Sequence, residues 1–277
     1  MRLADSADLP GLGSVGTWLN DPANWVKSPN NLLIHIREHV IYTVVAVLLA
    51  LLIALPVGLL VGHTRRGVVI IAGLANSLRA IPSLGLVVLL VVGISPKIHE
   101  TQAIPGVLDR GQLPYFIPIE IILVLLAIPP ILVNTYAGVQ NVDPYARDAA
   151  KGMGMTGLQV VRKVEFPCAL PLILSGLRSA VLQVIATATV AAYAPLLGGL
   201  GRLIVDGDGQ LNNKNVGYPA MVGAGIVVAA LALVADVLLV IVGRYAVSRG
   251  ISGRYRKAAA PQLPADGTVS EVQMMRA

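Results

Sequence analysis

The residues that most directly suggest chemistry lie near the start of the chain, in the run His35-Ile36-Arg37-Glu38-His39. This run fits the pattern H-x-x-E-H, in which two histidines four residues apart share one face of a helix and bind Zn²⁺ while the glutamate acts as a base. The pattern is short, no third ligand lies nearby, and it borders the first long apolar segment. A membrane zinc hydrolase using His35, Glu38 and His39 is therefore one hypothesis. An amphipathic helix at the outer face of the membrane is the preferred interpretation.

Two glycine-bearing stretches resemble ligand-binding loops only in part. Residues 197–201 read L-G-G-L-G, but the chain contains no Gly-Lys-Ser/Thr and therefore no nucleotide-binding P-loop. Residues 206–210 begin like a calcium loop, but the central glycine is missing and Gly217 stands where a glutamate is required. We therefore expect no catalytic residue and no metal site in this chain.

The composition indicates an all-α, polytopic membrane protein. Of 277 residues, 55% are hydrophobic and 13% are charged, which is too little charge for the surface of a soluble protein of this size. The net charge of +6 does not indicate nucleic-acid binding, because the basic residues border apolar segments instead of forming one patch. Cys168 is the single cysteine, which excludes an internal disulfide.

Five apolar segments are long enough to cross a bilayer of about 30 Å at about 1.5 Å per residue. They are residues 40–62, 68–94, 115–139, 172–194 and 218–243. The second is interrupted at Pro82, so it is either one kinked helix or a short helix followed by a span, and six spans is the alternative count. Arg178 and Asp236 lie within the last two segments, where charged groups need partners, and we expect them to form a buried pair.

The distribution of basic residues predicts the orientation. Arg65 and Arg66 follow the first span and further arginines follow the last, so the N-terminus is expected outside and the C-terminus in the cytoplasm. The predicted divisions are an extracytoplasmic segment 1–39, a transmembrane domain 40–243 with a cytoplasmic loop 141–171, and a cytoplasmic tail 244–277.

The cytoplasmic loop has helix signals of its own. Asp143 is a suitable N-cap, and Pro144 then occupies the first helical position, where its missing N–H costs nothing. Gly152 and Gly154 are expected to end this helix. A second short helix is expected to begin at Thr156 and to end at Pro167. Two short helices joined by a glycine bend predict a compact projection that a partner protein can grip.

This loop resembles the cytoplasmic coupling motif of binding-protein-dependent ABC importer permeases. That motif reads E-A-A, three residues, Gly, nine residues, a branched aliphatic residue, one residue, Leu, Pro. The matching positions here are Asp148, Ala149, Ala150, Gly154, Val164, Phe166 and Pro167. The spacing is met throughout, with Asp for Glu, Val for Ile and Phe for Leu. The resemblance implies that these residues couple the chain to an ATPase.

The resemblance extends to the permeases for quaternary-amine osmoprotectants over residues 33–244. It is carried by residues 76–83, 134–138, 152–155, 187–189 and 198–201. Two departures are Arg79, where a glutamine is common, and Val133, where an arginine often stands. Polar groups at membrane depth suggest a translocation pathway, although small polar groups also bond helix to helix. The pathway candidates are Arg79, Pro82, Asn134, Thr135 and Tyr136.

The resemblance implies a type I ABC importer permease (MetI-like) fold in a bacterial plasma membrane. It also implies a transporter subunit, not an enzyme, that imports glycine betaine, choline, carnitine or proline. A separate cytoplasmic ATPase dimer would bind ATP and Mg²⁺, so this chain would need no cofactor. The other implied partners are a second permease copy, identical or related, and an extracytoplasmic solute-binding protein. An importer for another small solute, such as an amino acid, is the alternative.

Overall fold

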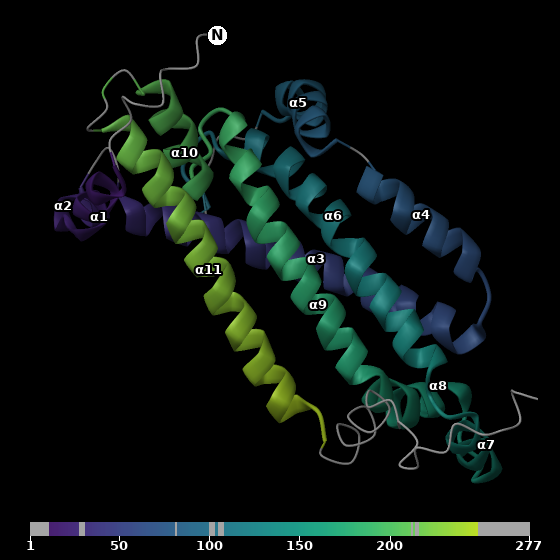
Figure 1. Ribbon diagram of the computed structural model, residues 1–277. Coiled ribbons are helices and arrows are strands. Elements are labelled where there is room, and N and C mark those ends of the chain that lie inside the picture. The colour runs from purple at the N-terminus through teal and green to yellow at the C-terminus, as the bar shows by residue number, and fades with distance from the viewer. Residues whose placement is uncertain are drawn as a thin grey trace, which may run out of the picture.

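The computed structural model describes residues 11–27, 31–80, 82–99, 103–104, 108–211, 213 and 216–248. The regular elements of these residues are helices (Figure 1), and one isolated antiparallel bridge joins Ile104 to Leu108. The prediction of an all-α protein is confirmed.

Four helices of the described residues are long and apolar enough to span a membrane. They are α3 (Leu32–Thr64), α6 (Leu113–Gln140), α9 (Phe166–Ala188), which continues a helical run from Gly157 to Tyr193, and α11 (Gly217–Ala246). The first begins well before the expected Val40, because Asn31 caps it by accepting a hydrogen bond from the Ile34 N–H. The H-x-x-E-H residues therefore belong to the first turns of α3.

The second apolar segment is broken at the predicted proline. It forms α4 (Val68–Ala80) and α5 (Ser83–Ile94), and Pro82 stands between them as the N-cap of α5 with φ −63° and ψ 111°. With 13 and 12 residues, each helix is shorter than the roughly 20 residues that a span needs. The second predicted span is thus a pair of shorter helices that both pack against α6.

The centre of the molecule is the contact of α3, α6 and α9, and small residues bring these helices close together. A Cβ atom added to Gly58 of α3 would lie 2.7 Å from the Cβ of Thr135 on α6. A Cβ atom on Gly176 of α9 would lie 2.6 Å from the Cβ of Asn134. Both distances are shorter than a van der Waals contact, so glycine permits this approach of the backbones, as is common between membrane helices.

Five of the shorter helices lie at the two ends of the molecule (Figure 1). At one end lie α1 (Leu12–Asn20), α2 (Pro22–Val26) and α10 (Leu200–Gly209), and Trp18 of α1 packs on Leu200 of α10 and Ala224 of α11. At the other end lie α7 (Pro144–Gly152) and α8 (Gly157–Val160). The loop of residues 141–171 is therefore a separate feature at one tip of the helix bundle.

The expected pair of Arg178 and Asp236 forms, and it joins α9 to α11. Arg178 donates to Asp236 through both Nε and a terminal nitrogen, the second at 2.7 Å to Oδ2. The expectation that the pair is buried is wrong, because 47% of the Arg178 side chain and 21% of the Asp236 side chain are exposed.

Candidate functional site

The first helix of the loop at residues 141–171 forms as its sequence predicts. The Asp143 carboxylate accepts a hydrogen bond of 2.9 Å from the Tyr145 N–H, and Pro144 takes the first position of α7. The helix ends at Gly152, and Gly154 follows with φ +78°. Because L-residues with a side chain avoid this left-handed conformation, glycine is needed at the bend.

The second helix differs from its prediction at its end. Thr156 and Gln159 form a capping box at the start of α8, as the threonine suggested. The chain then widens into a π-helical turn, Val161–Glu165, and runs directly into α9, so Pro167 does not end a helix. As the second residue of α9, Pro167 occupies a first-turn position where a missing N–H is tolerated.

The loop exposes apolar side chains at the tip of the molecule. Tyr145 is 84% exposed, and Met153 and Leu158 are also exposed. Of the three motif residues on α7, Asp148 and Ala149 are exposed and Ala150 is buried. Exposed large apolar side chains on a polar loop mark a surface for a protein partner.

A buried carboxylate holds this projection to the ends of the membrane helices. Glu165 is 1% exposed, with Oε1 2.9 Å from Arg147 Nε and Oε2 2.8 Å from His63 Nδ1. Arg147 also donates to the carbonyl oxygen of Val139 near the end of α6. We call His63, Arg147 and Glu165 the Glu165 cluster; it joins α3, α6, α7 and the turn before α9.

The Glu165 cluster is not predictable from a local sequence pattern. Its one local signal is a carboxylate directly before Phe166-Pro167 at the start of an apolar segment. The partners of this carboxylate lie far along the chain, 102 positions away in the case of His63. The π-helical turn that carries Glu165 is of a kind that often occurs at functional sites.

Two of the pathway candidates bond to their own helix. Asn134 donates to the Pro130 carbonyl at 2.8 Å, and Thr135, fully buried, donates to the Ile131 carbonyl at 2.7 Å. Tyr136 is half-buried on the same helix. Pro82 caps α5, and the side chain of Arg79 lies outside the described residues. The role of these five residues in a pathway stays a prediction.

The H-x-x-E-H residues hold α3 to its neighbours. His39 Nε2 lies 3.0 Å from the Ile185 carbonyl oxygen of α9. Glu38 accepts a 2.8 Å hydrogen bond from the Gly199 N–H and lies 3.4 Å from His35 Nδ1. Within the part of the chain that the structure describes, no three histidine, cysteine or acidic side chains are grouped to hold a metal ion.

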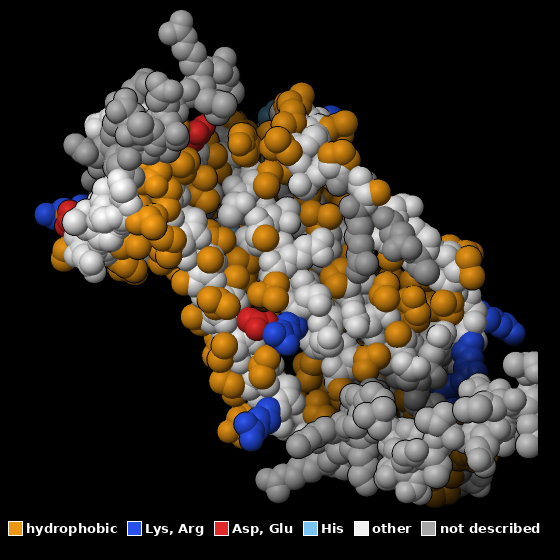
Figure 2. Space-filling view, viewed as in Figure 1, with side chains coloured by type: hydrophobic (Ala, Val, Ile, Leu, Met, Phe, Trp, Pro, Cys, Tyr) orange, Lys and Arg blue, Asp and Glu red, His pale blue; other side chains and the backbone are white. Residues whose placement is uncertain are grey.

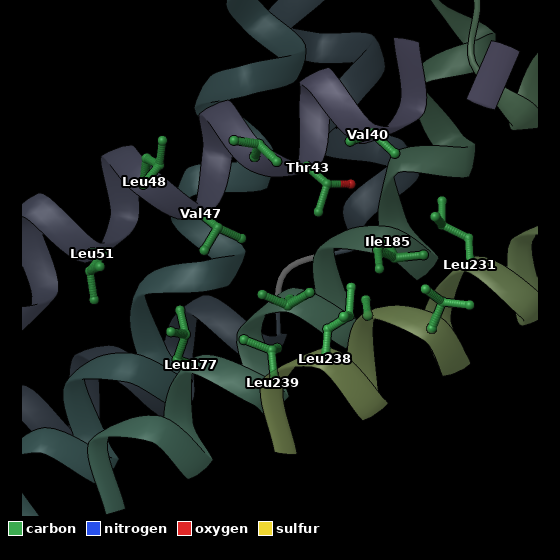
Figure 3. A pocket seen from close by; sticks show the side chains of 14 residues that line it. Val40, Thr43, Val47, Leu48, Leu51, Leu177, Ile185, Leu231, Leu238 and Leu239 are labelled. Carbon is green, nitrogen blue, oxygen red and sulfur yellow. The ribbon is translucent and has the colours of Figure 1, made fainter. Parts of the chain in front are cut away.

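A cavity of about 420 Å³ lies between α3, α9 and α11 (Figure 3). Figure 3 shows Val47 and Leu48 of α3 on one side and Leu238 and Leu239 of α11 on the other. Thr43 is the polar side chain of the lining, and its hydroxyl donates to the His39 carbonyl. Because the lining offers no charged group and no free polar group, this cavity cannot recognise an ion or a zwitterion.

Comparison with known sequences places the chain among transport permeases. Residues 54–246 match the family of binding-protein-dependent transport system inner membrane components. The glycine betaine/carnitine/choline transport system permease protein OpuCB of Bacillus subtilis (strain 168) is 30% identical over 222 residues, which cover 80% of this chain and 91% of that protein. The carnitine transport permease protein OpuCB of Listeria monocytogenes is 32% identical over 214 residues, with coverage of 77% and 87%.

Solved structures share the arrangement of helices. A chain of the methionine ABC transporter MetNI in an inward-facing conformation superposes with a TM-score of 0.63 at 20% sequence identity, covering 83% of this chain and all of that one. A chain of an amino acid ABC transporter superposes with a TM-score of 0.55 at 20% identity, with coverage of 81% and 98%.

Proposed function

Because the chain belongs to the family of binding-protein-dependent transport system inner membrane components, we propose that it is the permease subunit of an ATP-driven importer for quaternary-amine osmoprotectants. The fold is the predicted type I ABC importer permease fold. The chain is a transporter subunit and not an enzyme, so the zinc-hydrolase hypothesis is wrong. Of the residues of that hypothesis, His39 instead bonds α3 to α9 and Glu38 bonds it to Gly199 at the start of α10.

The names of the relatives support the proposed solutes. They include glycine betaine, carnitine and choline, carried by proteins that match most of this chain at 30% identity or more. Proline is not among these names, so its transport stays a prediction. The amino-acid alternative is weaker, because the amino-acid transporters that superpose on this chain share the fold at 20% identity.

We propose that α7 and α8 form the projection that the partner ATPase grips. The observation that carries this proposal is an exposed apolar projection tied by the Glu165 cluster to the ends of the membrane helices. Asp148 and Ala149 would contact the ATPase, while Gly154 provides the bend between the two helices. Val164 and Pro167 lie where the projection joins α9, and Ala150 packs inward.

The remaining partners and the orientation follow from this scheme. The chain has no nucleotide motif, so ATP and Mg²⁺ would bind the partner ATPase. A second permease copy would complete the pathway, and an extracytoplasmic binding protein would deliver the solute to the end formed by α1, α2 and α10. Arg147, Lys151, Arg162 and Lys163 lie at the coupling end, which supports a cytoplasmic position for that end in a bacterial inner membrane.

Uptake into liposomes tests the proposal. The chain, its ATPase and its binding protein are reconstituted, and entry of labelled glycine betaine, carnitine, choline and methionine is followed with and without ATP. We expect ATP-dependent uptake of the quaternary amines and none of methionine. A complex that hydrolyses ATP but moves none of the quaternary amines would overturn the solute assignment and leave the importer architecture in place.

A further inference from the structure

The pair of Arg178 and Asp236 has an unusual position for two charged side chains. At about 1.5 Å rise per residue, each lies about 15 Å or more from either end of its helix, so both are within the apolar layer. Charged side chains at that depth are costly next to lipid and normally face protein or water. Nearly half of the Arg178 side chain is nevertheless exposed in the single chain.

Other polar side chains share the exposed surface of α9. Ser175 and Ser179 lie three positions before and one position after Arg178, and all three residues are exposed. Figure 2 shows an acidic and a basic patch in contact partway along α11 and α9, on the face of the molecule behind which α3 runs in Figure 1. The pair is therefore on a different face from the apolar cavity beside α3. Two exposed serines accompany Arg178 on α9, while the exposed neighbours of Asp236 on α11 include Leu233 and Val237.

We propose that Arg178 and Asp236 form a transient binding site for a zwitterionic solute on the translocation pathway. This inference rests on the proposed function, since glycine betaine and carnitine each carry one carboxylate and one quaternary ammonium group. The Arg178 guanidinium would bind the solute carboxylate through two parallel hydrogen bonds, as it now binds Asp236. The Asp236 carboxylate, released from Arg178, would lie beside the ammonium group.

The present geometry explains why such a site would release its solute. When the site is empty, the two side chains satisfy each other, so no unpaired charge stands at membrane depth. An entering zwitterion exchanges one ion pair for two, and its departure restores the original pair. Because the solute competes with a bidentate internal pair, binding is weak, which transport requires.

A double variant distinguishes the effect of the two charges from the effect of the bond that joins α9 to α11. Arg178→Gln with Asp236→Asn leaves two groups that can still hydrogen-bond to each other but carry no charge. We expect ATP-driven uptake of glycine betaine to fall on the order of tenfold, the loss of one charge-assisted hydrogen bond, while ATP hydrolysis stimulated by loaded binding protein is retained. The control is thermal unfolding in detergent. The double variant is expected to unfold near the wild-type temperature, because its two neutral side chains can still hydrogen-bond to each other.

The single variant Arg178→Gln tests whether Arg178 binds the carboxylate end of the solute. Choline has the quaternary ammonium group but no carboxylate, so its uptake is expected to persist when glycine betaine uptake falls. Equal loss of both solutes would contradict the assigned role of Arg178. Normal uptake of glycine betaine by the double variant would overturn the site altogether.

A labelling experiment tests the site without altering the pair. In a Cys168→Ala background, Ser179→Cys places the single thiol next to Arg178. We expect a water-soluble thiosulfonate bearing a quaternary ammonium group to modify this thiol in the assembled transporter, and glycine betaine to slow the reaction. A thiol that does not react lies against lipid or the second copy, which would refute the proposal. If the wild type transports no quaternary amine, the proposed function is wrong. If the wild type and the double variant both transport glycine betaine normally, only the proposed solute site is wrong.

Discussion

Glu165 is the residue on which the attachment of the coupling projection most depends. Its carboxylate is 1% exposed and lies against one side chain from α3 and one from α7. Loss of its charge would leave the Arg147 guanidinium, itself buried, without its anion. Removal of one partner from a buried ion pair is strongly destabilising, by about 3–5 kcal/mol.

We therefore predict that Glu165→Gln uncouples ATP hydrolysis from uptake and lowers the thermal stability of the chain. The glutamine keeps the shape of the side chain but not its charge, so the position of α7 relative to α9 is expected to loosen. Thermal unfolding in detergent and the ratio of solute moved to ATP hydrolysed measure the two effects. Arg162→Gln, an exposed change in the same π-helical turn, is the control. Unchanged uptake and unfolding in Glu165→Gln would exclude a linking role for the cluster.

Among individual side chains, those with local partners could be predicted from the sequence, and those with distant partners could not. Asp143 and Thr156 cap helices because the oxygen of a short polar side chain can accept a hydrogen bond from a free N–H in the first helical turn. The contact of His63 with Glu165 depends on the packing of α3 against the loop, which no local pattern encodes. Arg178 and Asp236 were expected to pair because each needs a partner, but their exposure depends on the face of α9 that carries them.

At the scale of elements, the bend between α7 and α8 is set by backbone conformation. Gly152 and Gly154 both have open space where a Cβ atom would stand, but only Gly154 has a positive φ, at +78°. A side chain would therefore meet no clash at either position, but only at Gly154 would it strain the backbone. An L-residue in the left-handed region costs about 1–2 kcal/mol.

We predict that Gly154→Ala lowers ATP-driven uptake several-fold, whereas Gly152→Ala, within α7, leaves uptake unchanged. Alanine favours a helical conformation, so at position 154 it would extend α7 and move the exposed side chains of α8. Uptake and ATPase binding to the reconstituted chain measure the effect. Equal behaviour of the two variants would show that the bend is not required.

Two prolines in apolar segments have different effects on the helices that contain them. Pro82 breaks the second apolar segment, because a proline inside a helix removes a hydrogen bond and clashes with the preceding turn. Pro167 has the same chemistry but directly follows the π-helical turn Val161–Glu165, and the helical run continues through it. The effect of each proline depends on its surroundings. Pro82 lies between two helices that pack against α6, and Pro167 follows the π-helical turn.

At the scale of the whole molecule, the single chain leaves much of its apolar surface without a partner. The buried residues of α11 are confined to its first turns, from Gly217 to Ala224, and the rest of this long helix is covered on one side by α9. Lipid can cover such a surface, but the exposed charged pair that joins this helix to α9 needs protein or water. A pathway enclosed by two permease copies satisfies both requirements, which connects the proposed dimer to the proposed solute site.

The orientation of the whole molecule gives a final prediction. The coupling end carries α7 with Lys151 and the basic turn with Arg162 and Lys163, so this end is expected in the cytoplasm. Two exposed residues at opposite ends, Tyr145 on α7 and Asp208 on α10, provide reporter positions. In a Cys168→Ala background, Asp208→Cys should react with a membrane-impermeant maleimide in intact cells. Tyr145→Cys should react only after permeabilisation. The chain is expressed without its ATPase so that no partner shields α7, and labelling of Tyr145→Cys in intact cells would mean that the projection faces outward and cannot be the ATPase contact.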